Sequence, residues 1–234
     1  MFTRSTPSEN LVHPAEPSVT PAPAQSDHSR LLLVCAVLAL GAATVAAMII
    51  LRPVPRNDLS YVSLAPVRDS VFWWSLVDGV AFAATAVALA IAVSVCTPRR
   101  GRVLALIGAP MAAVAGVIFA CALVSIAAVG WHATAPAVPR AVGIQILDGL
   151  QETVVPFALL PIGFLTYTLG SLILLGAVWR AGVIARPWLI IFGALTLMQF
   201  SPGPRSILDV IQVLINGCLV AFAIHIYSHA SHRS

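Results

Sequence analysis

Charged residues are scarce in this chain, and lysine is missing altogether. Only 9% of the 234 residues are charged, against about 25% in an average soluble domain. A water-soluble globule with so few charges lacks the polar groups to cover its surface, so the composition indicates that a lipid bilayer surrounds most of the chain. The net charge of +4 is small, and its scattered arginines form no basic face that would bind nucleic acid.

The sequence also lacks the short motifs that carry well-known chemistry. Four cysteines are present, but they are far apart and all lie in apolar runs, so they indicate neither a disulfide framework nor a redox pair. No GxSxG, HExxH, P-loop or dinucleotide fingerprint occurs. An intramembrane enzyme is therefore the least favoured class of function, and no cofactor is indicated.

What the sequence does contain is long apolar runs between polar ends. Residues 1–30 are rich in Pro, Ser, Thr and Ala, which predicts a disordered cytoplasmic tail, and residues 229–234 form a second short tail. A spanning helix needs about 20 residues to cross about 30 Å of hydrocarbon. Six apolar segments predict an all-α transmembrane bundle over residues 31–228: 31–51, 75–96, 103–129, 155–179, 187–200 and 207–227.

The segment 187–200 is the short one. Its helix would rise only about 21 Å at about 1.5 Å per residue, so it either extends into its flanks, thins the bilayer or re-enters without crossing. We favour a short crossing because Pro187 suits the first turn of a helix.

Arginine placement predicts the orientation of the bundle. The connection "TPRRGR" carries Arg99, Arg100 and Arg102, and the next such turn carries Arg180 and Arg186. Since arginine is enriched in cytoplasmic loops, both turns and both chain ends are expected inside, in a bacterial cytoplasmic membrane. Arg52, Arg56 and Arg68 lie in the first outer loop and count against this orientation.

Small residues recur on one side of three predicted helices. Gly108, Ala112, Gly116 and Ala120 are spaced by four in segment 103–129, and similar stripes run along segments 75–96 and 155–179. Such stripes let helix backbones approach closely in lipid, where the usual hydrophobic drive is absent. These three helices are predicted to form the tight core of the bundle.

The connection between segments 103–129 and 155–179 has helical periodicity of its own. From residue 140 to 153, apolar residues fall on one face, and Gln145, Asp148 and Glu152 fall on the other. The pattern predicts an amphipathic helix at the outer interface. Pro156 and Pro161 then predict a kink or a break.

Two stretches, "SLVDGV" (75–80) and "SILDVI" (206–211), place a serine three residues before an aspartate at the start of an apolar segment. In the first interpretation Ser75 and Ser206 are helix N-caps and the aspartates reach back to complete them.

In the second interpretation the aspartates belong to a site, because an ionisable residue inside a span is a functional hypothesis by default. Asp209, Gln212 and Asn216 share one helix face at i, i+3 and i+7. With Asp78 they would flank an outward-facing polar cleft that binds a solute or a cation, with Thr166 or Ser171 nearby.

Three histidines close the chain. His225, His229 and His232 are spaced i, i+4 and i+7 and would share a face, as metal ligands do, if the helix continued to the terminus. Chain ends fray, however, and no acid or cysteine stands close in sequence to complete a site, so a solvated interfacial tail is favoured over a metal site.

The stretch "LGSLILLGAVWRAGVIARPWLIIFGALTL" (169–197) resembles a pattern of uncharacterised actinobacterial membrane proteins. In that pattern a glycine-rich helix ends in Trp-Arg, as at Trp179-Arg180, and a short basic turn leads to Pro-Trp, as at Pro187-Trp188. The resemblance implies a compact bundle of about six helices and brings no activity with it.

Two functions remain open from the sequence. The first is a non-enzymatic membrane component, an accessory, sensor or scaffold subunit whose partners are other membrane proteins. The second is a small-solute or cation permease whose path is lined by Asp78, Asp209, Gln212 and Asn216.

Overall fold

The computed structural model describes residues 25–53, 59–97, 99–152, 154–202 and 204–231. This part of the chain is almost entirely helical and contains no strand, which confirms the predicted all-α fold. The predicted N-terminal tail lies mostly outside the described residues, as do residues 232–234. The elements are α1 (Gln25–Ile50), α2 (Tyr61–Leu64), the 3-10 turn η1 (Ala65–Val67), α3 (Arg68–Cys96), α4 (Arg102–Ala133), α5 (Arg140–Glu152), α6 (Val154–Ala181), α7 (Arg186–Met198) and α8 (Arg205–Ser231).

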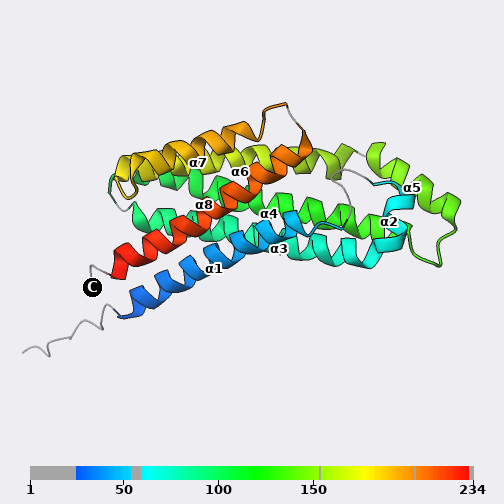
Figure 1. The fold of residues 1–234 in the computed structure, drawn as a ribbon, viewed down its shortest axis with the longest axis horizontal. Coiled ribbons are helices and arrows are strands. Elements are labelled where there is room, and N and C mark those ends of the chain that lie inside the picture. Colours follow the sequence, from blue (N-terminus) through cyan, green and yellow to red (C-terminus); the bar gives the residue numbers. More distant parts are fainter. Residues whose placement is uncertain (1–24, 54–58, 98, 153, 203, 232–234) are drawn as a thin grey trace, which may run out of the picture.

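Five of these helices are long and apolar enough to cross a bilayer: α1, α3, α4, α6 and α8. Figure 1 shows them side by side in one elongated bundle, with the start of α1 and the end of α8 at the same end. The described chain is that of a multi-pass membrane protein.

Helix α7 is the short apolar segment that the sequence predicts, and its 13 residues rise about 20 Å. It runs back along α6, toward the start of α8 (Figure 1). This course is the one that a short crossing requires, and the six-span count stays a prediction.

Helix α4 lies at the centre and makes its most extensive contacts with α3 and α6. The stripe of small residues lies in these contacts. A Cβ at Gly116 would collide with the Cβ of Ala86 on α3, and a Cβ at Gly108 would lie 3.0 Å from the carbonyl oxygen of Gly170 on α6. The expected tight core is therefore present, and its spacing depends on residues without a side chain.

Helix α1 covers a second side of the bundle, where it contacts α3 and α8. Leu38 and Ala42 of α1 are completely buried. Gly41 lies so close to α3 that a Cβ there would collide with the hydroxyl of Thr85. Helix α8 is thus held mainly by α1, on the side of the bundle away from the α4 core.

The amphipathic outer helix is confirmed as α5, which packs on α4. Gly143, Leu147 and Leu150 are buried, whereas Gln145 and Asp148 are exposed. Leu147 joins Leu64 and Ala133 in a small apolar cluster at this end of the bundle.

One boundary prediction is wrong. Helix α3 begins at Arg68, seven residues before Ser75, because no residue between them breaks a helix. At the prolines the sequence predicted a kink or a break, and no break occurs at Pro161, since α6 continues through it. Pro156 lies in the first turn of α6, where the missing N–H would have no helical partner, and neighbouring helices hold transmembrane segments together around an internal proline.

The close contact of α4 and α6 makes a direct prediction. A Cβ at Gly170 would lie 2.7 Å from the backbone nitrogen of Ala112, whereas a Cβ at Gly217 on α8 meets nothing within 4 Å. Gly170→Ala should destabilise the protein by about 1–3 kcal/mol through overpacking, measured as a lower unfolding temperature in detergent. Gly217→Ala is the matched control and should be neutral or slightly stabilising, because alanine favours a helix over glycine. Equal effects at both sites would contradict the packing described here.

Candidate functional site

The two serine–aspartate pairs are not helix caps. Ser75 lies inside α3 and is buried, so the predicted cap at residue 75 is wrong. Ser206 is the second residue of α8, and the backbone N–H groups of Ile207 and Leu208 donate to the carbonyl oxygen of Pro204 instead. Neither helix therefore begins at the serine that the sequence pattern predicts as its cap.

Asp209 forms an ion pair with Arg52, which follows α1. The Nη1 of Arg52 lies 3.5 Å from the Oδ1 of Asp209, and the two side chains are 15% and 30% exposed. The guanidinium of Arg52 also lies over the ring of Trp74, 5.4 Å from its centre, and the indole N–H of Trp74 donates to the carbonyl oxygen of Met48 at 2.8 Å. These contacts join α1, α3 and α8 near the end of α1 and the start of α8.

Next to this ion pair lies a polar cavity of about 80 Å³, here called the outer cavity. About 10–15 Å³ by this measure is enough for one water molecule, so the outer cavity has room for several waters or a small ion. Helices α1, α3, α4, α6, α7 and α8 all contribute to its walls. Its polar lining consists of Arg52, Asp78, Tyr167, Thr168, Ser171, Thr196, Gln199, Gln212 and Asn216.

The structure therefore brings three of the four predicted site residues, Asp78, Gln212 and Asn216, to one cavity. Asp209 is not among its lining residues, but it is paired with Arg52, which is. The Oδ1 atom of Asp78 is buried, and Asn216 is 9% exposed. Of the two residues expected nearby, Ser171 lines the outer cavity and Thr166 does not.

The short helix α7 and the turn that follows it form one wall of the outer cavity. The helix ends at Met198, about 10 Å short of the 30 Å hydrocarbon thickness, and the turn that follows brings Gln199 to the outer cavity. Aromatic rings close another side: the ring centres of Phe82 and Tyr167 are 4.8 Å apart, and those of Phe164 and Phe200 are 5.8 Å apart.

The polar lining of the outer cavity offers both acceptors and donors. Four groups donate to a backbone carbonyl oxygen three or four residues earlier in the chain, at 2.8–2.9 Å: Thr168, Thr196, Gln199 and Asn216. The two threonines have thereby used their only donor, and the two amides keep their carbonyl oxygens as acceptors. Asp78 adds a carboxylate that accepts, and Arg52 adds a guanidinium that donates.

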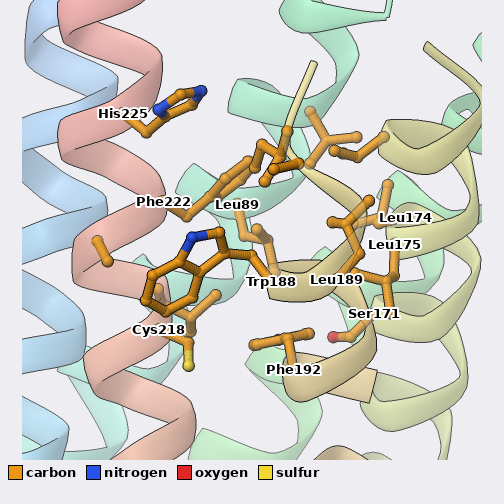
Figure 2. A pocket seen from close by; sticks show the side chains of 16 residues that line it. Leu89, Ser171, Leu174, Leu175, Trp188, Leu189, Phe192, Cys218, Phe222 and His225 are labelled. Atoms are coloured by element: carbon orange, nitrogen blue, oxygen red, sulfur yellow. The ribbon is translucent and has the colours of Figure 1, made fainter. Parts of the chain in front are cut away.

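A second, apolar cavity of about 300 Å³, here called the inner cavity, lies between α6, α7, α8 and α3. Figure 2 shows His225 at one end and Ser171 and Phe192 at the other, with Trp188 and Leu189 between them. Ser171, Phe192 and Leu219 line both cavities. The two spaces therefore share a wall in the middle of the bundle.

The predicted histidine face is only partly described. His225 is exposed, and its Nε2 lies 3.3 Å from the carbonyl oxygen of Val183 in the turn between α6 and α7. The side chain of His229 and all of His232 lie outside the described residues. Within the described residues, no group of three or more His, Cys, Asp or Glu side chains is placed to hold a metal ion.

Several lining residues were not predicted. Thr196 and Gln199 are the clearest omissions, because two polar residues at i and i+3 in the apolar segment 187–200 are themselves a signal for a site. Thr168 offered the same signal on α6. Arg52 offered none, since only the fold of the chain brings the residue after α1 beside the fifth residue of α8.

No protein-family model matches the chain, and no curated protein and no solved structure shows significant similarity to it. The resemblance to actinobacterial membrane proteins stays a prediction. Function must therefore be argued from the two cavities themselves.

The ion pair at the rim of the outer cavity makes a prediction. Arg52→Gln and Asp209→Asn should each destabilise the protein, and the double variant should be more stable than the sum of the two effects predicts, with a coupling of about 0.5–3 kcal/mol. Thermal unfolding of the three variants in detergent measures it. Arg180→Gln and Asp148→Asn, whose sites lie at opposite ends of the bundle (Figure 1), are the control and should be additive. Additivity at Arg52 and Asp209 as well would show that their pairing has no energetic role.

Proposed function

We propose that this protein is a small-solute permease of a bacterial cytoplasmic membrane, with both termini inside, and that it binds a small cation or amine in the outer cavity. The observation that carries the proposal is the convergence of polar side chains from five segments on one cavity within an apolar bundle. Polar and ionisable groups inside a membrane are costly, and they are retained where they serve a solute or ion path.

The lining of the outer cavity suits an ammonium cation. Among the described lining residues the charged ones are Asp78 and Arg52, and the guanidinium of Arg52 is paired with Asp209. The carboxylate of Asp78 and the amide and hydroxyl oxygens of the lining can accept the three hydrogen bonds that an ammonium group donates.

A non-enzymatic accessory or scaffold role is the second candidate. The observation that favours it is that the same polar groups also fasten the helices: Arg52 to Asp209 between α1 and α8, and Trp74 to Met48 between α3 and α1. In that role Asp78 would affect stability only, and no solute would depend on it.

Replacement of Asp78 separates the two candidates. If the outer cavity binds cations, Asp78→Asn should weaken binding of methylammonium by about ten- to a hundredfold, since a hydrogen bond to a charged group contributes about 1.5–3 kcal/mol. Calorimetry on the purified protein in detergent measures the affinity, and uptake of radiolabelled methylammonium into proteoliposomes measures transport.

Asp148→Asn is the matched control, because Asp148 is exposed on α5 and does not line the cavity. It should leave binding and uptake unchanged. A protein that binds methylammonium equally well with either substitution, or not at all in its natural form, would overturn the cation proposal and leave the scaffold role.

The proposed orientation has its own test. Ser201, which follows α7, and Ala185, which precedes it, are both exposed and lie at opposite ends of the bundle. In a variant without the four natural cysteines, Ser201→Cys should react in intact cells with a thiol reagent that cannot cross membranes. Ala185→Cys should react only after permeabilisation. The reverse pattern would invert the topology and place the outer cavity on the cytoplasmic side.

A further inference from the structure

The inner cavity is a feature of the structure that the proposed function leaves unused. Its lining is mostly aliphatic and aromatic, with Trp188, Phe192 and Phe222 among the residues, and His225 at its far end (Figure 2). A volume of about 300 Å³ falls at the lower end of the range for small-molecule sites, which are mostly apolar with a few placed polar groups. The inner cavity has the size for a ligand and lacks a polar anchor of its own, apart from Ser171 and His225.

The outer cavity supplies that anchor. Ser171, Phe192 and Leu219 belong to the walls of both cavities, so a ligand that passes these three residues reaches from the carboxylates into the apolar space. Ser171 is buried, at 4% exposed, and lies at the end of the inner cavity away from His225 (Figure 2). Polar recognition and apolar volume are thus adjacent along one line through the bundle.

We infer that the two cavities together form one amphipathic site, and that its ligand is a primary amine with an apolar body. The ammonium group occupies the outer cavity beside Asp78, and the apolar body extends past Ser171 and Phe192 into the inner cavity. This inference rests on the proposed cation binding and adds to it the class of substrate.

The lining distinguishes a primary amine from other charged amphiphiles. An ammonium group donates three hydrogen bonds, which match the carbonyl oxygens of Gln199 and Asn216 and the carboxylate of Asp78. A quaternary ammonium has the same charge but no N–H to donate. An alkyl sulfate would bring a negative charge beside the carboxylate of Asp78.

In this proposal the apolar body of the ligand lies in the inner cavity and not in the surrounding lipid. Substitutions that fill the inner cavity test this placement. Ala221 and Cys218 of α8 line it, so Ala221→Phe and Cys218→Phe each place a ring in the space. Ala194 of α7 is exposed and does not line either cavity, so Ala194→Phe is the matched control. Comparison of variants in one detergent cancels the partition of each amine into the micelles.

Calorimetric titration with methylammonium and octylammonium tests the inference. Octylammonium should bind about tenfold more weakly to Ala221→Phe and to Cys218→Phe than to the natural protein, a loss of about 1.4 kcal/mol. Methylammonium, which does not reach the inner cavity, should bind all of them equally. Ala194→Phe should change neither affinity, and octyltrimethylammonium should bind the natural protein about fivefold more weakly than octylammonium, for want of N–H donors.

The outcomes separate this inference from the function on which it rests. If methylammonium binding depends on Asp78 but octylammonium is indifferent to both filling variants, the amphipathic site is wrong and the cation site stands. If octyl sulfate or octyltrimethylammonium binds as well as octylammonium, the primary-amine class is wrong. If neither amine depends on Asp78, both proposals fail. Thermal unfolding of each variant shows whether Ala221→Phe or Cys218→Phe has lost its fold. If one of them has, the binding data of the other test the inference.

Discussion

The close approach of α4 to α3 and α6 is the contact on which the rest of the structure depends. Lipid tails are as apolar as leucine, so helices in a bilayer associate through packing and hydrogen bonds, and small residues give the best packing. Four glycines provide this packing: Gly108 and Gly116 of α4, and Gly163 and Gly170 of α6. At each of them an added Cβ would lie 3.0 Å or less from an atom of a neighbouring helix. Three long helices are thereby closely packed as one half of the bundle.

The other half is built differently, and both cavities lie between it and the first half. Helix α8 is held mainly by α1, while α7 makes far less extensive contacts than the central helices do. Helix α7 has only 13 residues, and Gln199 lies in the turn that follows it. The closely packed half supplies Asp78 and Ser171 to the outer cavity, and the other half supplies Gln212 and Asn216. Such a division suits a carrier, in which one part of a bundle moves against another around a fixed site.

Much of this arrangement was predictable. Apolar length located every long helix, because each must cover about 30 Å of hydrocarbon, and the spacing of buried Gly143, Leu147 and Leu150 located α5. Three of the four predicted site residues line one cavity, since a polar stripe on an apolar helix has to face something other than lipid. The boundary of α3 was predicted wrongly: the pattern at Ser75 has the form of a cap, but caps act only where a helix begins, and this helix begins at Arg68.

The sequence by itself determined that this is an all-α membrane bundle, which residues are small enough for close contact, and which polar residues lie within apolar segments. Those properties follow from composition and helical period, which are local. Tertiary structure alone decided that Arg52 pairs with Asp209, that Thr196 and Gln199 join Asp78, and that the two cavities share Ser171, Phe192 and Leu219. The physical reason is that these neighbours come from helices far apart in the chain, so their contacts depend on how each helix is rotated against the next.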